Sequence, residues 1–290
     1  MKKCESLATA KAVGSLALAK AVEYVDKKKL HGDSAVFFRV PESLIFDSNA
    51  PPETMVAFAY LSVRSGIDGS VMLSLNHMAE WSGRKPDKHK GMVNDRMCNA
   101  LSYLSGLGYA RMYGTLSHAS PSEGRFDREC VSRRCDEERY AVLYVDEVRK
   151  LLSSDEVPSS EKESSLLLLA YLRMMIPRRV NEFFAEESDV EDRRRRYPEA
   201  YNARYQDIAA ELNVTPRSVS KMADALSSLG LIYSEPMPRQ RDEDGKWHTG
   251  NTLFCNFYKR EGSYLLASGK EYYASEVKRK KEKLESFRRR

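Results

Sequence analysis

The stretch "YQDIAAELNVTPRSVSKMADALSSLGLIYSEP", residues 205–236, decides the fold. Its apolar residues recur at intervals of three and four, which predicts two short amphipathic helices. Between them, Thr215 is a good N-cap and Pro216 suits the first position of a helix. Two short helices with so tight a turn form a helix-turn-helix. The residues expected to face inward are Tyr205, Ile208, Ala209 and Leu212, then Val219, Met222, Ala223 and Leu226.

A small β-structure is expected after the second helix. Gly230 ends that helix, "LIYSEP" follows as a strand, and "TLFCNFYK" alternates as a second strand. Two strands joined by a charged loop form a wing, so this region is predicted to be a winged helix. Upstream, "SSEKESSLLLLAYLRMMI" predicts the supporting helix, with Ser160 and Glu163 as a capping box.

The same parts occur earlier in the chain. "MCNALSYLSGLGY", residues 97–109, matches "MADALSSLGLIY", residues 222–233, when Met97 is placed on Met222 and one extra residue brings Gly106 onto Gly230. "PETMVAFAYLSVR" and "SLNHMAEWSG" predict the preceding helices, and "GRKPDKHKG" is a long basic joint. "YARMY" and "RYAVLYV" are candidate wing strands around a wing loop at 114–138. The residues expected to face inward are Leu75, Met78, Ala79, Val93, Met97, Ala100, Leu101 and Leu104.

The fold class is therefore expected to be mainly α with small β wings, an α+β protein of two tandem winged-helix domains plus terminal helices. The expected parts are an N-terminal helix (1–34), a first winged-helix domain (35–152), a linker (153–160), a second winged-helix domain (161–260) and a basic C-terminal helix or tail (261–290).

Composition narrows the class of protein. The chain has 290 residues and a net charge of +5, a mild basic excess that permits nucleic acid as a partner. Its five cysteines are an odd number, which favours a reducing compartment over a disulfide framework. Lys11 and Lys20 interrupt the apolar start, and no stretch is long enough to span a membrane. We expect a cytoplasmic protein without a membrane partner.

The outward faces of the two predicted recognition helices carry the candidate DNA contacts. The N-terminal residues of such a helix meet base edges in the major groove, while wings and basic joints meet phosphates. The alternatives are a solvated polar face in the second unit and a mobile charged loop in the first. The candidates are Thr215, Arg217, Ser218, Ser220 and Lys221, then Arg239, Arg241 and Lys246 in the second wing, Arg84, Lys85, Lys88 and Lys90 in the joint, and Asn94, Arg96 and Asn99 on the first recognition helix.

Signs of catalysis are missing from the sequence. There is no phosphate-binding G-x-x-x-x-G-K-[ST] motif and no close His-x-His pair. Cys130 and Cys135, with His118 upstream, hint at zinc, but a second pair of ligands is missing. We therefore expect a binding protein without metal or cofactor, not an enzyme.

One segment resembles a known family. In "AVFFRVPESLIFDSNAPPETMVAFAYLSVR" an aromatic pair, Phe37 and Phe38, precedes Val40, Pro41 and Leu44. Over residues 35–112 this is similar to the N-terminal module of RepA_N-type plasmid replication initiators, although "DSNAPPET" and the long joint depart from that pattern. The second unit is more loosely similar to initiators with tandem winged helices. The resemblance implies binding of origin repeats, dimerisation through the first unit and recruitment of host replication proteins.

Three functions are compatible with these features. The leading hypothesis is a sequence-specific double-stranded DNA-binding protein that initiates replication of a plasmid or other mobile element. The second is a transcriptional regulator of the same architecture, bound to an operator. The third is a primosome or partner adaptor whose winged helices bind protein, which predicts little DNA affinity and a shallow salt dependence.

Overall fold

The computed structural model describes residues 36–114, 122–176, 200–237, 240–241, 247–248 and 251–256. In these ranges the chain forms α-helices and four small antiparallel sheets, the α+β composition expected from the sequence. No helix in these ranges is both long and apolar enough to pass through a membrane. Several predictions fall outside the described residues: the N-terminal helix, the basic tail, Arg239, Lys246 and His118.

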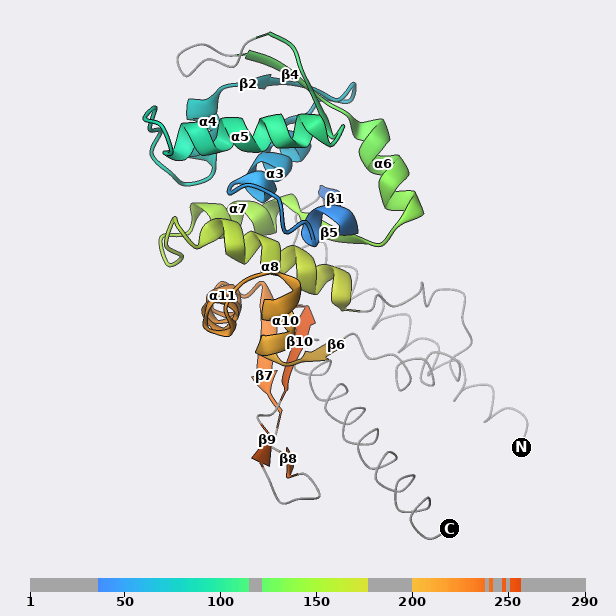
Figure 1. The fold of residues 1–290 in the computed structure, drawn as a ribbon, viewed down its shortest axis with the longest axis vertical. Helices are drawn as coiled ribbons and strands as arrows, with labels where there is room; N and C mark the ends of the chain where they lie inside the picture. Colours follow the sequence, from blue (N-terminus) through green and yellow to red (C-terminus); the bar gives the residue numbers. More distant parts are fainter. Residues whose placement is uncertain are drawn as a thin grey trace, which may run out of the picture.

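The first unit contains a helix, a strand, two helices and two further strands (Figure 1). Its third strand lies in the middle of an antiparallel sheet of order β2-β4-β3. The three helices have the positions expected from the sequence. The elements are α3 (Thr54–Arg64), β2 (Ser70–Leu73), α4 (Leu75–Trp81), α5 (Val93–Gly106), β3 (Ala110–Met112) and β4 (Ser122–Phe126).

The second unit repeats this order of elements. Its sheet has the order β6-β10-β7, so the last strand is again central. A short β8-β9 hairpin extends from between its second and third strands (Figure 1). The elements are α8 (Lys162–Met175), β6 (Ala200–Ala203), α10 (Tyr205–Glu211), α11 (Pro216–Ser228), β7 (Ile232–Pro236), β8 (Gln240–Arg241), β9 (Trp247–His248) and β10 (Thr252–Asn256).

The first unit carries additional elements that correct one prediction. The segment "RYAVLYV" is a strand, but it pairs with "FFRVP" at the start of the unit instead of forming the wing. This pairing buries Val40 against Ala141 and Phe38 against Leu143. The additional elements are β1 (Phe37–Pro41), α2 (Glu42–Ile45), α6 (Arg128–Glu137), β5 (Tyr140–Tyr144) and α7 (Val145–Ser153).

The expected wing loop at 114–138 instead contains β4 and α6. The strand β4 was missed because "SEGRF" lacks apolar alternation, and only Phe126 supplies a large buried side chain. Gly124 lies directly over Leu73 of the neighbouring strand, where any added methyl group would clash. The missing side chain at Gly124 makes room for the Leu73 side chain, a requirement that hydrophobic patterning does not reveal.

The repeat has a different register from the one expected. The buried residues of α5 and α11 correspond when 122 is added to each number in the first helix, whereas placing Met97 on Met222 requires 125. The expected alignment was therefore wrong by three residues, nearly one helical turn, and no inserted residue is needed. The buried sets are Met97, Ala100, Leu101 and Leu104, and Val219, Met222, Ala223 and Leu226.

The two helices also end alike. Gly108 and Gly230 follow the helix ends with φ of 79° and 62°. The next amide in each copy donates back into the helix over 2.9 Å, from Tyr109 to Leu104 and from Leu231 to Leu226. This is the Schellman ending, for which glycine is favoured. Gly230 was correctly predicted as the terminator, but its counterpart is Gly108 and not Gly106.

The two units share one buried core. The helix α8 packs against α3, α7 and β5 of the first unit and against α11 of the second (Figure 1). One continuous apolar cluster extends from Phe38 to Phe254, and Val157 between the units belongs to it. The relative position of the two helix-turn-helix pairs is therefore determined by packing on α8.

Candidate nucleic-acid interface

The start of α11, where the sequence predicts DNA contacts, is exposed. Thr215 caps the helix, because its Oγ1 accepts from the amide of Ser218 at 3.1 Å. Val219 is fully buried on the opposite face, so Arg217 and Lys221 point outward and are exposed. Lys221 Nζ lies 3.6 Å from Glu161 of the second unit's leading segment, and its side chain remains 57% exposed.

The other candidates on this helix have smaller roles. The hydroxyls of Thr215 and Ser218 lie 2.8 Å apart and share a hydrogen bond, so both groups serve the cap. Ser220 is half-buried beside the packed face. In the segment expected to form the second wing, Arg241 lies in β8 opposite Trp247.

The basic joint of the first unit, residues 83–91, is folded over the start of α5. The amide of Gly91 donates to Asp95 at 2.8 Å, and Asn94 both donates to and accepts from the backbone of Asp87, each at 3.1 Å. These contacts tie the joint to the helix at several points. Apart from Arg84, its basic side chains remain exposed: Lys85, Lys88, His89 and Lys90.

Two candidates in the first unit are buried, which corrects the prediction. Arg84 is 8% exposed and forms an ion pair with Glu53, while Nε and Nη2 donate to the carbonyl of Ser159 at 3.1 and 2.9 Å. Burial lowers the pKa of Arg84. Asn94 is fully buried and donates to Asn76 at 2.7 Å. These side chains hold the helix-turn-helix together, so they are not available to DNA.

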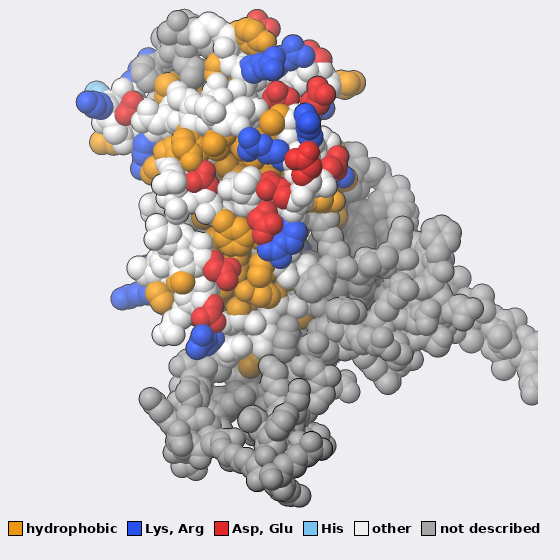
Figure 2. Space-filling model, turned by 45° about the vertical axis from the view of Figure 1, so that its right-hand side comes forward, with side chains coloured by type: hydrophobic (Ala, Val, Ile, Leu, Met, Phe, Trp, Pro, Cys, Tyr) orange, Lys and Arg blue, Asp and Glu red, His pale blue; other side chains and the backbone are white. Residues whose placement is uncertain are grey.

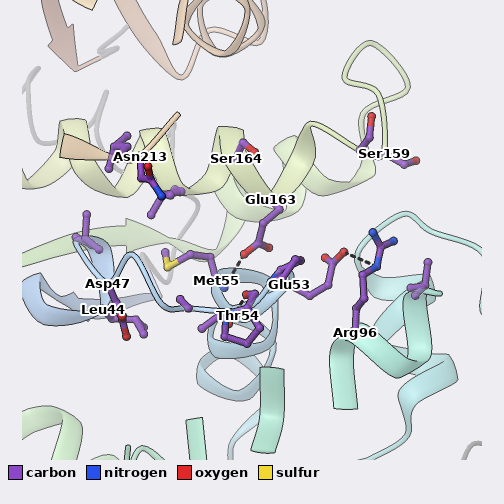
Figure 3. A pocket seen from close by; sticks show the side chains of 18 of the residues that line it. Leu44, Asp47, Glu53, Thr54, Met55, Arg96, Ser159, Glu163, Ser164 and Asn213 are labelled. Atoms are coloured by element: carbon purple, nitrogen blue, oxygen red, sulfur yellow. Dashed lines mark hydrogen bonds and ion pairs between the residues drawn. The ribbon is translucent and has the colours of Figure 1, made fainter. Parts of the chain in front are cut away.

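Arg96 is half-exposed but turned toward Glu53, with 3.7 Å between Nε and Oε1 (Figure 3). It is the single lysine or arginine within α5. Only Asn99 of the three α5 candidates is exposed as expected. The open face of α5 is therefore nearly uncharged, in contrast to the start of α11.

The segment before α8 brings the two helix-turn-helix pairs close together. Its Ser159 carbonyl binds Arg84 of the first unit, and Glu161, two residues later, pairs with Lys221 of the second. A cavity of about 850 Å³ lies between the units and is lined from both, including Arg96 and Asn213 (Figure 3). The joint of the first unit and the start of α11 thus flank the same segment.

Two arginines outside the predicted set lie on the outer face of the first sheet. Arg111 and Arg125 are opposite each other on β3 and β4, and both are exposed. Acidic groups accompany them: Arg111 Nε lies 4.0 Å from Asp127, and Asp68 lies in the same small cavity. Arg125 could not be predicted because its strand was missed. On the face shown in Figure 2, basic and acidic side chains are likewise interspersed, without a single basic patch.

The two cysteines that gave a hint of zinc, Cys130 and Cys135, lie on α6. Burial raises the pKa of Cys135 to about 11, which disfavours the thiolate that binds metal. Within the described ranges no group of three or more histidine, cysteine or acidic side chains is placed to hold a metal ion.

Comparisons of the chain with protein-family models, with curated proteins and with solved structures found no match.

Proposed function

We propose that the protein binds double-stranded DNA in a sequence-specific way through two tandem winged-helix units. The support is that each unit has the order helix, strand, two helices and two strands, with the last strand central, which is the order expected of a winged helix. The observation that carries the proposal is the start of α11. There a well-capped helix exposes Arg217 and Lys221. Such a helix places its first residues against base edges in the major groove.

The two units then have different tasks. In the second unit, Arg217 can bond guanine in a bidentate way, which gives sequence preference. In the first unit the exposed charge is on the joint, at Lys85, Lys88 and Lys90. Lysines on a loop bind phosphates as point charges, which adds affinity and salt dependence without sequence information. The sequence preference of the first unit then rests on the exposed Asn99 of α5, because an asparagine can bond a base edge.

Within this class, we propose a replication initiator of a plasmid or mobile element that binds origin repeats and recruits host replication proteins. The support is the likeness of "FFRVP" to initiator modules. A transcriptional regulator would have the same interface, and only the location of its sites would differ.

A second candidate is protein binding by the first unit. The nearly uncharged open face of α5 favours it, because a helix that enters the major groove normally carries basic side chains. On this reading the first unit serves as an adaptor or dimer contact, while α11 alone recognises DNA.

The test is selection of bound duplexes from a random pool, followed by Kd measurements at several salt concentrations. Enrichment of a defined site that Arg217→Ala weakens supports the proposal. Arg149→Ala on α7, an exposed site with the same loss of charge, is the matched control and should leave Kd unchanged. Equal, weak binding of all duplexes would refute sequence-specific recognition.

A further inference from the structure

Several charged side chains are buried within the otherwise apolar contact between the two units. On the first-unit side these are Glu53, Arg84 and Glu147, and on α8 they are Lys162 and Arg173, with the half-buried Glu163 next to Lys162. Charges are rarely buried without partners, because an unpaired charge away from water is strongly unfavourable. Each of these groups therefore restricts how the units can be oriented.

Glu163 caps a helix in the other unit (Figure 3). Its two carboxylate oxygens accept from the amides of Met55 and Val56, at 2.9 and 3.1 Å, in the first turn of α3. The residue at the N-cap position itself, Glu53, makes no side-chain cap bond and has a left-handed backbone with φ of 74°. The start of α3 thus depends on a carboxylate supplied by α8.

Further contacts fasten the same end of α8. Arg84 joins Glu53 to the Ser159 carbonyl, and Lys162 Nζ donates to the carbonyl of Leu152 at 2.5 Å. Gly83 lies directly against these last two groups, so that a methyl group there would clash with both. The start of the basic joint is therefore tightly seated on the beginning of α8.

Arg173 fastens the other end of α8. Its Nη2 donates to Glu147 of α7 at 2.5 Å and to the carbonyl of Leu231 at 3.2 Å. Leu231 is the residue directly after the terminating Gly230 of the second recognition helix. Arg173 therefore links the end of α11 to the first unit.

We propose that Glu163 and Arg173 hold the two helix-turn-helix pairs at one fixed separation, so that the protein recognises a two-part duplex site of a single spacing. The inference rests on the proposed DNA binding. Apolar surfaces alone could slide against each other, but sliding here would leave buried charges and amides unpaired. Adding one base pair moves the second half-site by about 3.4 Å and turns it by about a tenth of a helical turn. A rigid protein cannot follow that displacement.

The experiment uses the site obtained by selection, with 1, 2 and 5 base pairs added between its two parts. Inserting 1 base pair should weaken the affinity of the full-length protein for the site about tenfold or more. Glu163→Ala and Arg173→Met should show a flatter dependence on spacing, with unchanged affinity for the α11 half-site alone. Glu163→Gln, which keeps one acceptor, should remain close to the wild type.

A second measurement is independent of DNA. Spin labels are introduced at the exposed positions Ser102 on α5 and Ser228 on α11 through a non-natural amino acid, so that native cysteines remain unlabelled. The distance between the two labels should have a single narrow distribution in the wild type and a broad one in Glu163→Ala and Arg173→Met. A distribution as broad in the wild type, or affinity indifferent to spacing, would overturn the proposal. If no duplex were bound while the distance stayed narrow, the proposed function would fail and the spacing inference would fall with it.

Discussion

Gly108 and Gly230 occupy the same position after α5 and α11, with left-handed backbones and the same returning hydrogen bond. Gly106, two residues earlier than Gly108, lies inside α5. Neither Gly106 nor Gly108 has an atom within 4 Å of where a methyl group would be added. Gly106 and Gly108 therefore differ in backbone conformation and not in the space available for a side chain.

Substituting alanine at these two positions should have opposite effects. Gly108→Ala places a side chain in the left-handed region and should reduce the free energy of unfolding by about 1 kcal/mol. Gly106→Ala improves helix propensity and should raise the free energy of unfolding by up to about 1 kcal/mol. Chemical denaturation of both variants measures the difference. Equal destabilisation at both positions would contradict the assignment of Gly108 as the terminator.

Arg84 and Lys85 are neighbours in the chain, but their substitution should affect stability to very different degrees. Arg84→Ala leaves Glu53 buried without its partner and should cost about 3–5 kcal/mol of unfolding free energy. Lys85 is exposed, so Lys85→Ala should change stability by less than about 0.5 kcal/mol. Thermal unfolding of the two variants is sufficient as a measurement. A mild effect of Arg84→Ala would restore that arginine as a free DNA-binding candidate.

The burial of Arg84 shows why part of the site could not be predicted from the sequence. Arg84 was counted with the lysines of the joint because all are basic and adjacent. Its partners, Glu53 and Ser159, are distant in the sequence, and only tertiary packing brings them together. The start of α11 was predictable, because its capping threonine, proline and apolar spacing are all local signals.

The same distinction applies to the fold. The helices α3, α4, α5, α8, α10 and α11 were expected because each has its own apolar periodicity. The pairing of β1 with β5 joins segments about a hundred residues apart, and a strand pattern does not specify its partner. The capping box expected at Ser160 and Glu163 was also wrong. The side chain of Glu163 instead caps α3 in the other unit.

The unusual setting of Glu163 predicts a pH dependence of stability. Burial raises the pKa of this carboxyl from 4.5 to about 7, against the opposing effect of the Met55 and Val56 amides. The folded state therefore holds a proton that the unfolded state releases. Its stabilising effect is complete below about pH 4.5 and is lost as the pH rises through about 7. The loss should amount to up to about 3 kcal/mol.

Unfolding free energies measured from pH 5 to 8 for the wild type and Glu163→Gln check this prediction. The glutamine variant does not titrate, so its stability should fall less over this interval. Glu161→Gln changes the same functional group two residues earlier and serves as the control that should keep the wild-type slope. Parallel curves for the wild type and Glu163→Gln would show that the carboxyl does not titrate in this range.

The proposed division between α11 and the joint predicts two distinct kinds of binding defect. Arg217→Ala should cost about 1–3 kcal/mol on the preferred duplex and relax the preference at one base position, because base contacts carry sequence information. Replacing Lys85, Lys88 and Lys90 together with alanine should weaken binding to all duplexes alike. It should also reduce the slope of log Kd against log salt by about 3, since each lost phosphate contact contributes about 0.9. If the triple variant changed sequence preference, or Arg217→Ala lowered the salt slope without changing preference, the assignment of the two tasks would be reversed.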